Sequence, residues 1–114
     1  PILGVCLGHQ VIGYTYGSTI EKAPAIFHGK TSLVEHNNHT LFNEVPSPFN
    51  AMRYHSLIIT EESLNDDFEK IAWTKDGLIM GISHKELKLY GIQFHPESIG
   101  TDFGEQILLN FLSM

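Results

Sequence analysis

The sequence has 114 residues, of which 42% are hydrophobic and 18% are charged, and its formal net charge is −6. This composition is typical of one globular domain with a buried core, and the shortage of basic residues disfavours a nucleic-acid-binding protein. A single cysteine excludes an internal disulfide and no stretch is long and apolar enough to cross a bilayer, so we expect a cytoplasmic protein without membrane contact.

The chain opens on an apolar run, residues 1–5, which predicts a strand covered on both faces. Strands of this kind belong to parallel sheets flanked by helices, so the expected fold class is α/β. Parallel neighbours would have to precede this strand. We therefore expect residues 1–114 to be the C-terminal part of a single larger domain that lacks its N-terminal strands here. Residues 8–17 follow and predict a helix that ends at a glycine.

Six β-like runs fill the middle of the sequence, separated by Pro, Gly, Asn and Asp signals. They span residues 19–22, 32–35, 51–55, 68–74, 78–84 and 89–94. Asp76 and Gly77 predict a hairpin turn between the fourth and fifth runs. The last segment predicts a closing helix with Asp102 as its cap and Glu105 three residues later.

Cys6 stands between Gly4 and Gly8, at the junction of the first strand and the first helix. This spacing is that of the nucleophile elbow, with cysteine where serine is usual, and glycines on both sides would allow a strained, crowded turn. We expect the helix N-terminus to favour the thiolate of Cys6, and the backbone N–H of Leu7 to point at an oxyanion on the attacked carbonyl. The alternative is that Cys6 is a buried structural residue, which is the commoner role of a lone cysteine.

His95 and Glu97 flank Pro96 at the end of the last β-like run. Proline favours an extended conformation for the residue before it, and in an extended segment residues two apart face the same side. We therefore predict that the two side chains converge, so that His95 takes the proton of Cys6 while Glu97 holds the imidazole in one tautomer.

The segments GVCLGHQ (4–10) and FHPES (94–98) strongly resemble the two halves of the class I, triad-type glutamine amidotransferases. Two further segments, HGKTS (28–32) and RYHSL (53–57), are similar to the small subunit of anthranilate synthase or of aminodeoxychorismate synthase. The resemblance covers nearly the whole chain and implies a flavodoxin-like glutamine amidotransferase domain.

Residue by residue, the resemblance implies that Cys6 is the nucleophile, His95 the base and Glu97 the orienting carboxylate. It also implies that four positions contact the glutamine substrate: Leu7, Gln10, Ser56 and Leu57. The implied reaction is hydrolysis of glutamine to glutamate, without a cofactor or metal. The ammonia would pass to the large subunit of a chorismate-using synthase in tryptophan or folate biosynthesis.

Family members also carry an N-terminal part of the sheet and a Gly-rich loop that supplies a second oxyanion donor, and neither precedes Pro1. We expect the isolated 114 residues to be inactive and to associate with themselves through the exposed edge of the first strand. Two alternatives stay open: a cysteine hydrolase of γ-glutamyl substrates, and a non-catalytic fragment.

Two other motifs are similar to ligand-binding patterns, but we predict no ligand for either of them. Residues 29–31 are similar to the end of a phosphate-binding P-loop, but the position of its first glycine is Pro24, so we predict an ordinary loop. His36 and His39 are spaced like a metal-binding pair, but no third ligand is close in sequence. We predict that they lie in a solvated loop.

Overall fold

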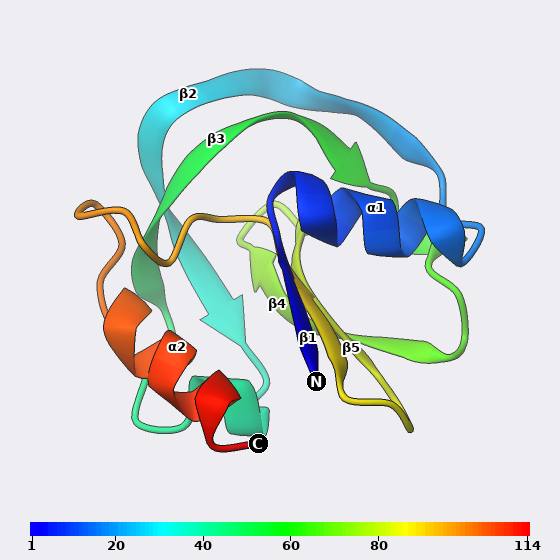
Figure 1. Ribbon diagram of the computed structural model, residues 1–114. Coiled ribbons are helices and arrows are strands. Elements are labelled where there is room, and N and C mark those ends of the chain that lie inside the picture. Colours follow the sequence, from blue (N-terminus) through cyan, green and yellow to red (C-terminus); the bar gives the residue numbers. More distant parts are fainter.

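The computed structural model describes residues 1–114 and has a mixed α/β fold, in which six strands form one curled sheet with two helices packed against it (Figure 1). The α/β class expected from the sequence is confirmed. In chain order the elements are β1 (Ile2–Val5), α1 (Leu7–Thr15), β2 (Ile20–His36), the 3-10 helix η1 (Thr40–Phe42), β3 (Phe49–Ile59), the 3-10 helix η2 (Glu61–Ser63), β4 (Phe68–Thr74), β5 (Ile79–His84), β6 (Leu89–Ile92) and α2 (Gly104–Leu112). Neither α1 nor α2 has the length and apolar character needed to span a membrane.

The strand order is β1-β6-β5-β4-β2-β3, and only β1 and β6 run parallel. The expectation of an all-parallel sheet is therefore wrong. Short turns at residues 75–78 and 85–88 join β4 to β5 and β5 to β6, and a short turn forces antiparallel pairing. The strands β2 and β3 also pair antiparallel, across the longer connection formed by residues 37–48. The predicted hairpin turn is confirmed, since the N–H of Gly77 donates to the carbonyl of Thr74 at 2.9 Å. The strand β1 lies at one edge of the sheet, and only Gly4 among its residues is buried, whereas Ile2 is 61% exposed, so the expected cover on both faces is incomplete.

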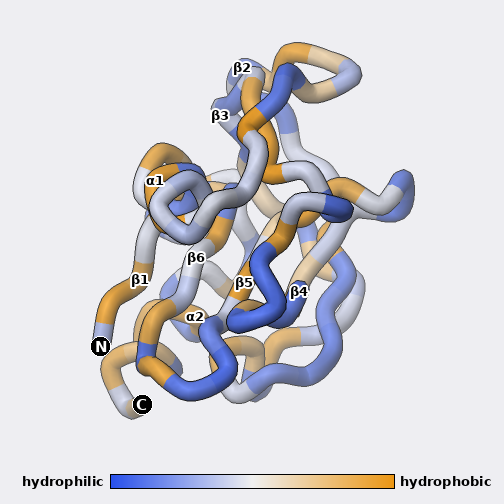
Figure 2. The backbone as a smooth tube through the Cα atoms, turned by 90° about the vertical axis from the view of Figure 1, so that its right-hand side faces the viewer, coloured by the Kyte–Doolittle hydropathy of each residue, from blue (hydrophilic) through white to orange (hydrophobic).

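The strand β2 joins the first two predicted β-runs into one strand of 17 residues. Its register against β3 shifts twice, between Lys22 and Phe27 and between His28 and Lys30. Pro24 lies in the first shift, and Gly29 lies in the second with a φ of 73°, as in a β-bulge. The loop predicted for residues 29–31 is therefore wrong, because a bulge absorbs the glycine without ending the strand. Figure 2 shows the β2–β3 ribbon projecting beyond the rest of the sheet.

The two helices cover opposite faces of the sheet. On β6, Gly91 faces α1, where an added Cβ would lie 2.6 Å from Nδ1 of His9, whereas the ring of Tyr90 meets Phe111 of α2. Neighbouring residues of a strand point to opposite faces, so each helix has its own core. The core beside α2 includes Phe42, Phe49, Ile92, Phe94 and Ile107; that beside α1 includes Ile59, Phe68, Ile79 and Ile82.

The predicted helix cap at Asp102 is wrong. The helix α2 begins at Gly104 after Phe103, whose φ is 61°, and no side chain caps it. Asp102 instead contacts Asn50 of β3: its N–H donates to the Asn50 carbonyl at 2.9 Å, and its carboxylate accepts from the Asn50 amide at 3.4 Å. Pairing with a distant strand has replaced local capping.

The solvated loop predicted around His36 is also wrong. His36 ends β2, is buried, and its Nε2 lies 2.9 Å from the carbonyl oxygen of Val45. Its ring stacks on Phe42 with a centroid separation of 4.7 Å, while the ring of His39 meets Tyr90 edge to face. The two histidines thus pack against aromatic side chains of the core.

Candidate active site

Cys6 forms the sharp turn between β1 and α1. It has φ 53° and ψ −102°, and its N–H donates to the carbonyl of Ile92 on β6 at 2.9 Å. An added Cβ at Gly4 would lie 2.6 Å from the carbonyl carbon of Gly8, so the first glycine is required by the close approach of strand and helix. The sequence also predicts that Gly8 is required by a crowded turn, and this is wrong, because an added Cβ at Gly8 would meet nothing within 4 Å.

We predict that Gly4→Ala destabilises the full-length protein by about 1–3 kcal/mol, because the new methyl overlaps the Gly8 backbone and Ile12. The matched control is Gly8→Ala, which adds the same methyl into open space on a helix and should be neutral or stabilising. Urea denaturation measures both. Equal unfolding midpoints for the two variants would contradict the crowded turn.

The thiol of Cys6 is partly buried and has two polar neighbours. Its Sγ donates to the carbonyl of Tyr54 at 3.5 Å and accepts from Nε2 of Gln93 at 3.8 Å. Burial raises the pKa of Cys6 above its ordinary value, hydrogen bonds from the Leu7 N–H and from Gln93 act against this rise, and the charge of Glu97 adds to it. The N–H at the helix N-terminus thus favours the thiolate, as expected, but burial has the larger effect on the pKa, so attack by this sulfur requires a base.

His95 and Glu97 are brought together just after β6. Nδ1 of His95 lies 2.9 Å from Oε2 of Glu97. A carboxylate only accepts, so Nδ1 carries a proton, and in the neutral imidazole Nε2 is the nitrogen with the free lone pair. The backbone of His95 is held on both sides: its N–H donates to the carbonyl of Met52 at 3.0 Å, and its carbonyl accepts from the hydroxyl of Thr101 at 2.6 Å.

Tyr54 of β3 links the two halves of the site. Its carbonyl accepts from the Cys6 thiol, and its ring meets the His95 ring edge to face, with centroids 5.5 Å apart. Cys6 and His95 therefore contact the same residue from opposite ends of the sequence. This role of Tyr54 could not be expected from the sequence, because nothing local places β3 between β1 and the segment after β6.

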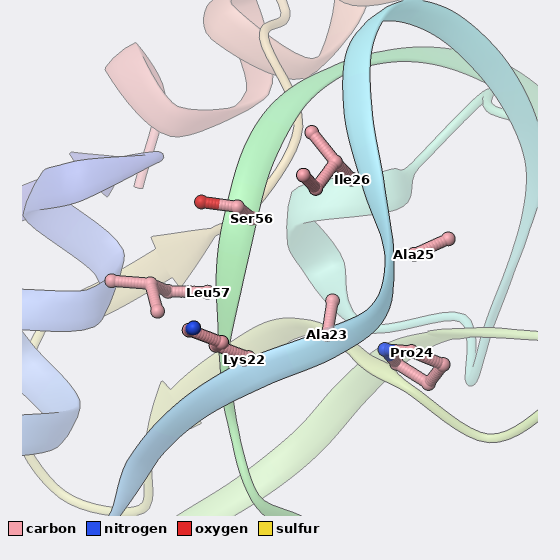
Figure 3. A pocket seen from close by; sticks show the side chains of 7 residues that line it. All are labelled: Lys22, Ala23, Pro24, Ala25, Ile26, Ser56 and Leu57. Atoms are coloured by element: carbon pink, nitrogen blue, oxygen red, sulfur yellow. The ribbon is translucent and has the colours of Figure 1, made fainter.

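A hollow of about 190 Å³ opens beside the thiol. All four predicted glutamine-contacting residues line it, together with Cys6 and two further residues of β3; the full lining is Cys6, Leu7, Gln10, Tyr54, His55, Ser56 and Leu57. Ser56 and Leu57 also line a neighbouring hollow of about 330 Å³ against β2 (Figure 3). The β3 segment carrying these two residues is thus a wall between two adjoining spaces. His95 and Glu97 line neither hollow.

Gln10 lies in the floor of the hollow with its amide already engaged. Its Nε2 donates to the carbonyl of Leu57 at 3.0 Å and to Oε1 of Gln93 at 3.3 Å. Gln10, which we predict to contact the glutamine substrate, therefore also links α1 to β3 and to the segment after β6.

A buried arginine, Arg53, contacts the β3 segment that lies between the two hollows. Arg53 is 2% exposed, and its guanidinium lies 3.3 Å from the ring centroid of Phe27 and donates through Nη1 to Ser32. Its Nε donates to Nε2 of His55 at 2.9 Å. Burial, assisted by the charge of Arg53, lowers the pKa of His55 to about 4, so this imidazole is neutral at physiological pH.

His9 of α1 lies outside this cluster and has a structural role. His9 is completely buried against Gly91, and burial lowers its pKa to about 3, so it too is neutral. No group of three or more His, Cys, Asp and Glu side chains is arranged to hold a metal ion.

Comparison with known proteins gives consistent matches over the whole chain. A family model described as glutamine amidotransferase class-I matches residues 1–114. Anthranilate synthase component 2 of Cyanophora paradoxa is 58% identical over 114 residues, which cover 99% of this chain and 60% of the relative. Aminodeoxychorismate synthase of Streptomyces griseus is 48% identical over 111 residues, which cover 97% of this chain and 15% of the relative.

The fold has a similar counterpart among crystal structures. A protein from Thermoplasma acidophilum, described as a GMP synthase subunit, matches with a TM-score of 0.91 and 32% sequence identity, covering 99% of this chain and 56% of that one. This chain spans at most 60% of the length of each of these three proteins.

Proposed function

The chain belongs to the class I glutamine amidotransferase family, and from that membership we propose that it carries the glutaminase site of a cytoplasmic two-component synthase. The observation that carries the proposal is that Cys6 and His95 both contact Tyr54. The Cys6 thiol bonds to the Tyr54 carbonyl, and the Tyr54 ring packs against a histidine already fixed by Glu97. The adjoining hollow is lined by Leu7, Gln10, Ser56 and Leu57.

The reaction begins when Nε2 of His95 takes the proton of the Cys6 thiol. This step requires the thiol to exchange its bond to the Tyr54 carbonyl for one to His95. The thiolate attacks the side-chain amide carbon of glutamine, and the carbonyl electron pair moves to the oxygen, which the N–H of Leu7 stabilises. Glu97 balances the positive charge on His95.

The tetrahedral intermediate then collapses, the C–N bond breaks, and His95 returns its proton so that ammonia leaves. The remaining glutamyl group is a thioester on Cys6. His95 next takes a proton from water, the hydroxide attacks the thioester, and glutamate departs as the Cys6 thiol is restored. The raised pKa of Cys6 supports a need for His95 in the first step.

We propose that the ammonia passes to the large subunit of a chorismate-using synthase. The names of the relatives support this partner, since one is a component of anthranilate synthase and another is an aminodeoxychorismate synthase. The synthase would use the ammonia to make anthranilate or aminodeoxychorismate, the chemistry of tryptophan or folate biosynthesis.

The choice of glutamine over a γ-glutamyl peptide gives a direct test. Glutamine has no group beyond its amide nitrogen, whereas a γ-glutamyl peptide carries a larger leaving group that must be accommodated beside the thiol, where the hollow measures about 190 Å³. We expect the full-length protein to release glutamate from glutamine with a kcat/KM at least about tenfold above that for a γ-glutamyl dipeptide. Preference for the dipeptide, with a Cys6→Ser blank subtracted, would replace this proposal with a γ-glutamyl hydrolase.

A further inference from the structure

Gln93 is fully buried, yet its amide touches the sulfur of Cys6. Its Nε2 donates to Sγ at 3.8 Å, and its Oε1 accepts from Nε2 of Gln10 at 3.3 Å. We propose that Gln93 is a further catalytic residue, whose amide N–H stabilises the Cys6 thiolate before it attacks. This inference rests on the proposed role of Cys6 as nucleophile.

The orientation of the Gln93 amide is fixed by its partner. If the amide were turned over, its oxygen would face the sulfur and its NH₂ group would face the NH₂ group of Gln10, so two donors would meet. Gln10 cannot turn over in compensation, because its Nε2 also donates to the carbonyl of Leu57, which can only accept. Gln93 is therefore held with a donor on the thiol.

The buried arginine, Arg53, fixes the tautomer of His55 in a similar way. The Leu57 carbonyl lies 3.0 Å from Nδ1 of His55, and Nε of Arg53 donates to Nε2 of that histidine. A guanidinium has donors only, so His55 must accept at Nε2 and donate at Nδ1. The tautomer of His55 thus follows from Arg53, while the orientation of Gln10 follows from the Leu57 carbonyl and that of Gln93 follows from Gln10.

A donor at this position offsets the burial of the thiol. Burial raises the pKa of Cys6, and the two groups that lower it are the N–H of Leu7 and the amide of Gln93. Hydrogen bonds to ionised groups are roughly twice as strong as those between neutral groups, so Gln93 favours the thiolate over the thiol. A fixed amide dipole also needs no rearrangement when the negative charge forms.

The test uses Gln93→Leu and Gln93→Asn in the full-length protein. Leucine removes the donor, and asparagine withdraws it by one methylene. The measurement is the rate of Cys6 alkylation by iodoacetamide across pH, quantified at the Cys6 peptide by mass spectrometry. We expect the midpoint of the pH profile to rise by about one unit, so that alkylation at neutral pH slows about tenfold, while the rates converge at high pH.

The matched control is Gln106→Leu, which removes a glutamine amide from α2 that bonds only to Asn110. Its pH profile should equal that of the wild type. Loss of packing alone would lower the unfolding midpoint without moving the pH midpoint of alkylation. In the wild-type protein, the side-chain amide signal of Gln93 in a ¹H–¹⁵N spectrum should titrate with the Cys6 midpoint, which tests the contact independently of how the variants fold.

An unchanged alkylation midpoint in a folded variant, or a Gln93 amide signal that ignores the ionisation of Cys6, would overturn the proposal. These readouts do not depend on glutamine hydrolysis. If Cys6→Ser hydrolysed glutamine normally while the Gln93 variants still shifted the thiol midpoint, the proposed function would fail and the contact would stand. If Cys6→Ser were inactive and the midpoint did not move, only the role of Gln93 would fail.

Discussion

Cys6→Ser should abolish glutamine hydrolysis in the full-length protein, with kcat/KM falling by more than about 10⁴-fold. The site is arranged around a sulfur: its donors, Gln93 and the N–H of Leu7, favour a thiolate, and a serine hydroxyl ionises far less readily at the same pH. Glutamate release measures the loss. A glutamine-analogue electrophile should label Cys6 in the wild type and leave the variant unlabelled.

The control for Cys6→Ser is synthesis from ammonium salts by the assembled complex. Because free ammonia bypasses the thiol, this activity should stay near the wild-type level and show that the variant is folded and assembled. Glutamine hydrolysis by Cys6→Ser at a rate near that of the wild type would remove the covalent mechanism.

His95→Ala should eliminate glutamine-dependent synthesis by the complex, again by about 10⁴-fold, while synthesis from added ammonium continues. Burial raises the pKa of Cys6, so without the imidazole the thiol lacks a base, and departing ammonia lacks a proton donor. The ratio of glutamine-dependent to ammonium-dependent product formation reports the effect without depending on the amount of complex.

A matched control for His95→Ala is His84→Ala, which removes an imidazole from the last residue of β5, where it accepts from the N–H groups of Glu86 and Leu87 in the following turn. Its ratio of glutamine-dependent to ammonium-dependent synthesis should equal that of the wild type. Equal loss of both activities in His95→Ala would contradict the proposed division between ammonia release and ammonia use.

The parts of the site that are local in sequence could be predicted. Spacing alone indicates the strand-to-helix turn at Cys6 and the convergence of His95 with Glu97, because each depends on residues within a few positions of one another. The boundaries of β4 were predicted for the same reason, from the run of strand-forming residues 68–74. Local stereochemistry is the main determinant of these features.

The parts that depend on distant packing could not be predicted. The direction of the pKa shift of Cys6 is set mainly by burial, which outweighs the local hydrogen bond from the Leu7 N–H. Asp102 pairs with Asn50 instead of capping α2. Gln93 could have been suspected, because it stands two residues before His95 and shares its side of an extended segment, but its contact with Cys6 depends on the pairing of β1 with β6.

The parallel pairing of β1 with β6, in which Gly4 lies beside Gly91, also determines when the site can form as the polypeptide is translated. The thiol and the amide that contacts it are separated by 87 positions, so closing this contact carries a large entropy cost. In the order of translation, Cys6 precedes the strand β6 and the proposed base and carboxylate, His95 and Glu97. The proposed glutaminase site is therefore complete only after residues 89–97 have been made, so a chain that ends before them cannot hydrolyse glutamine by this mechanism.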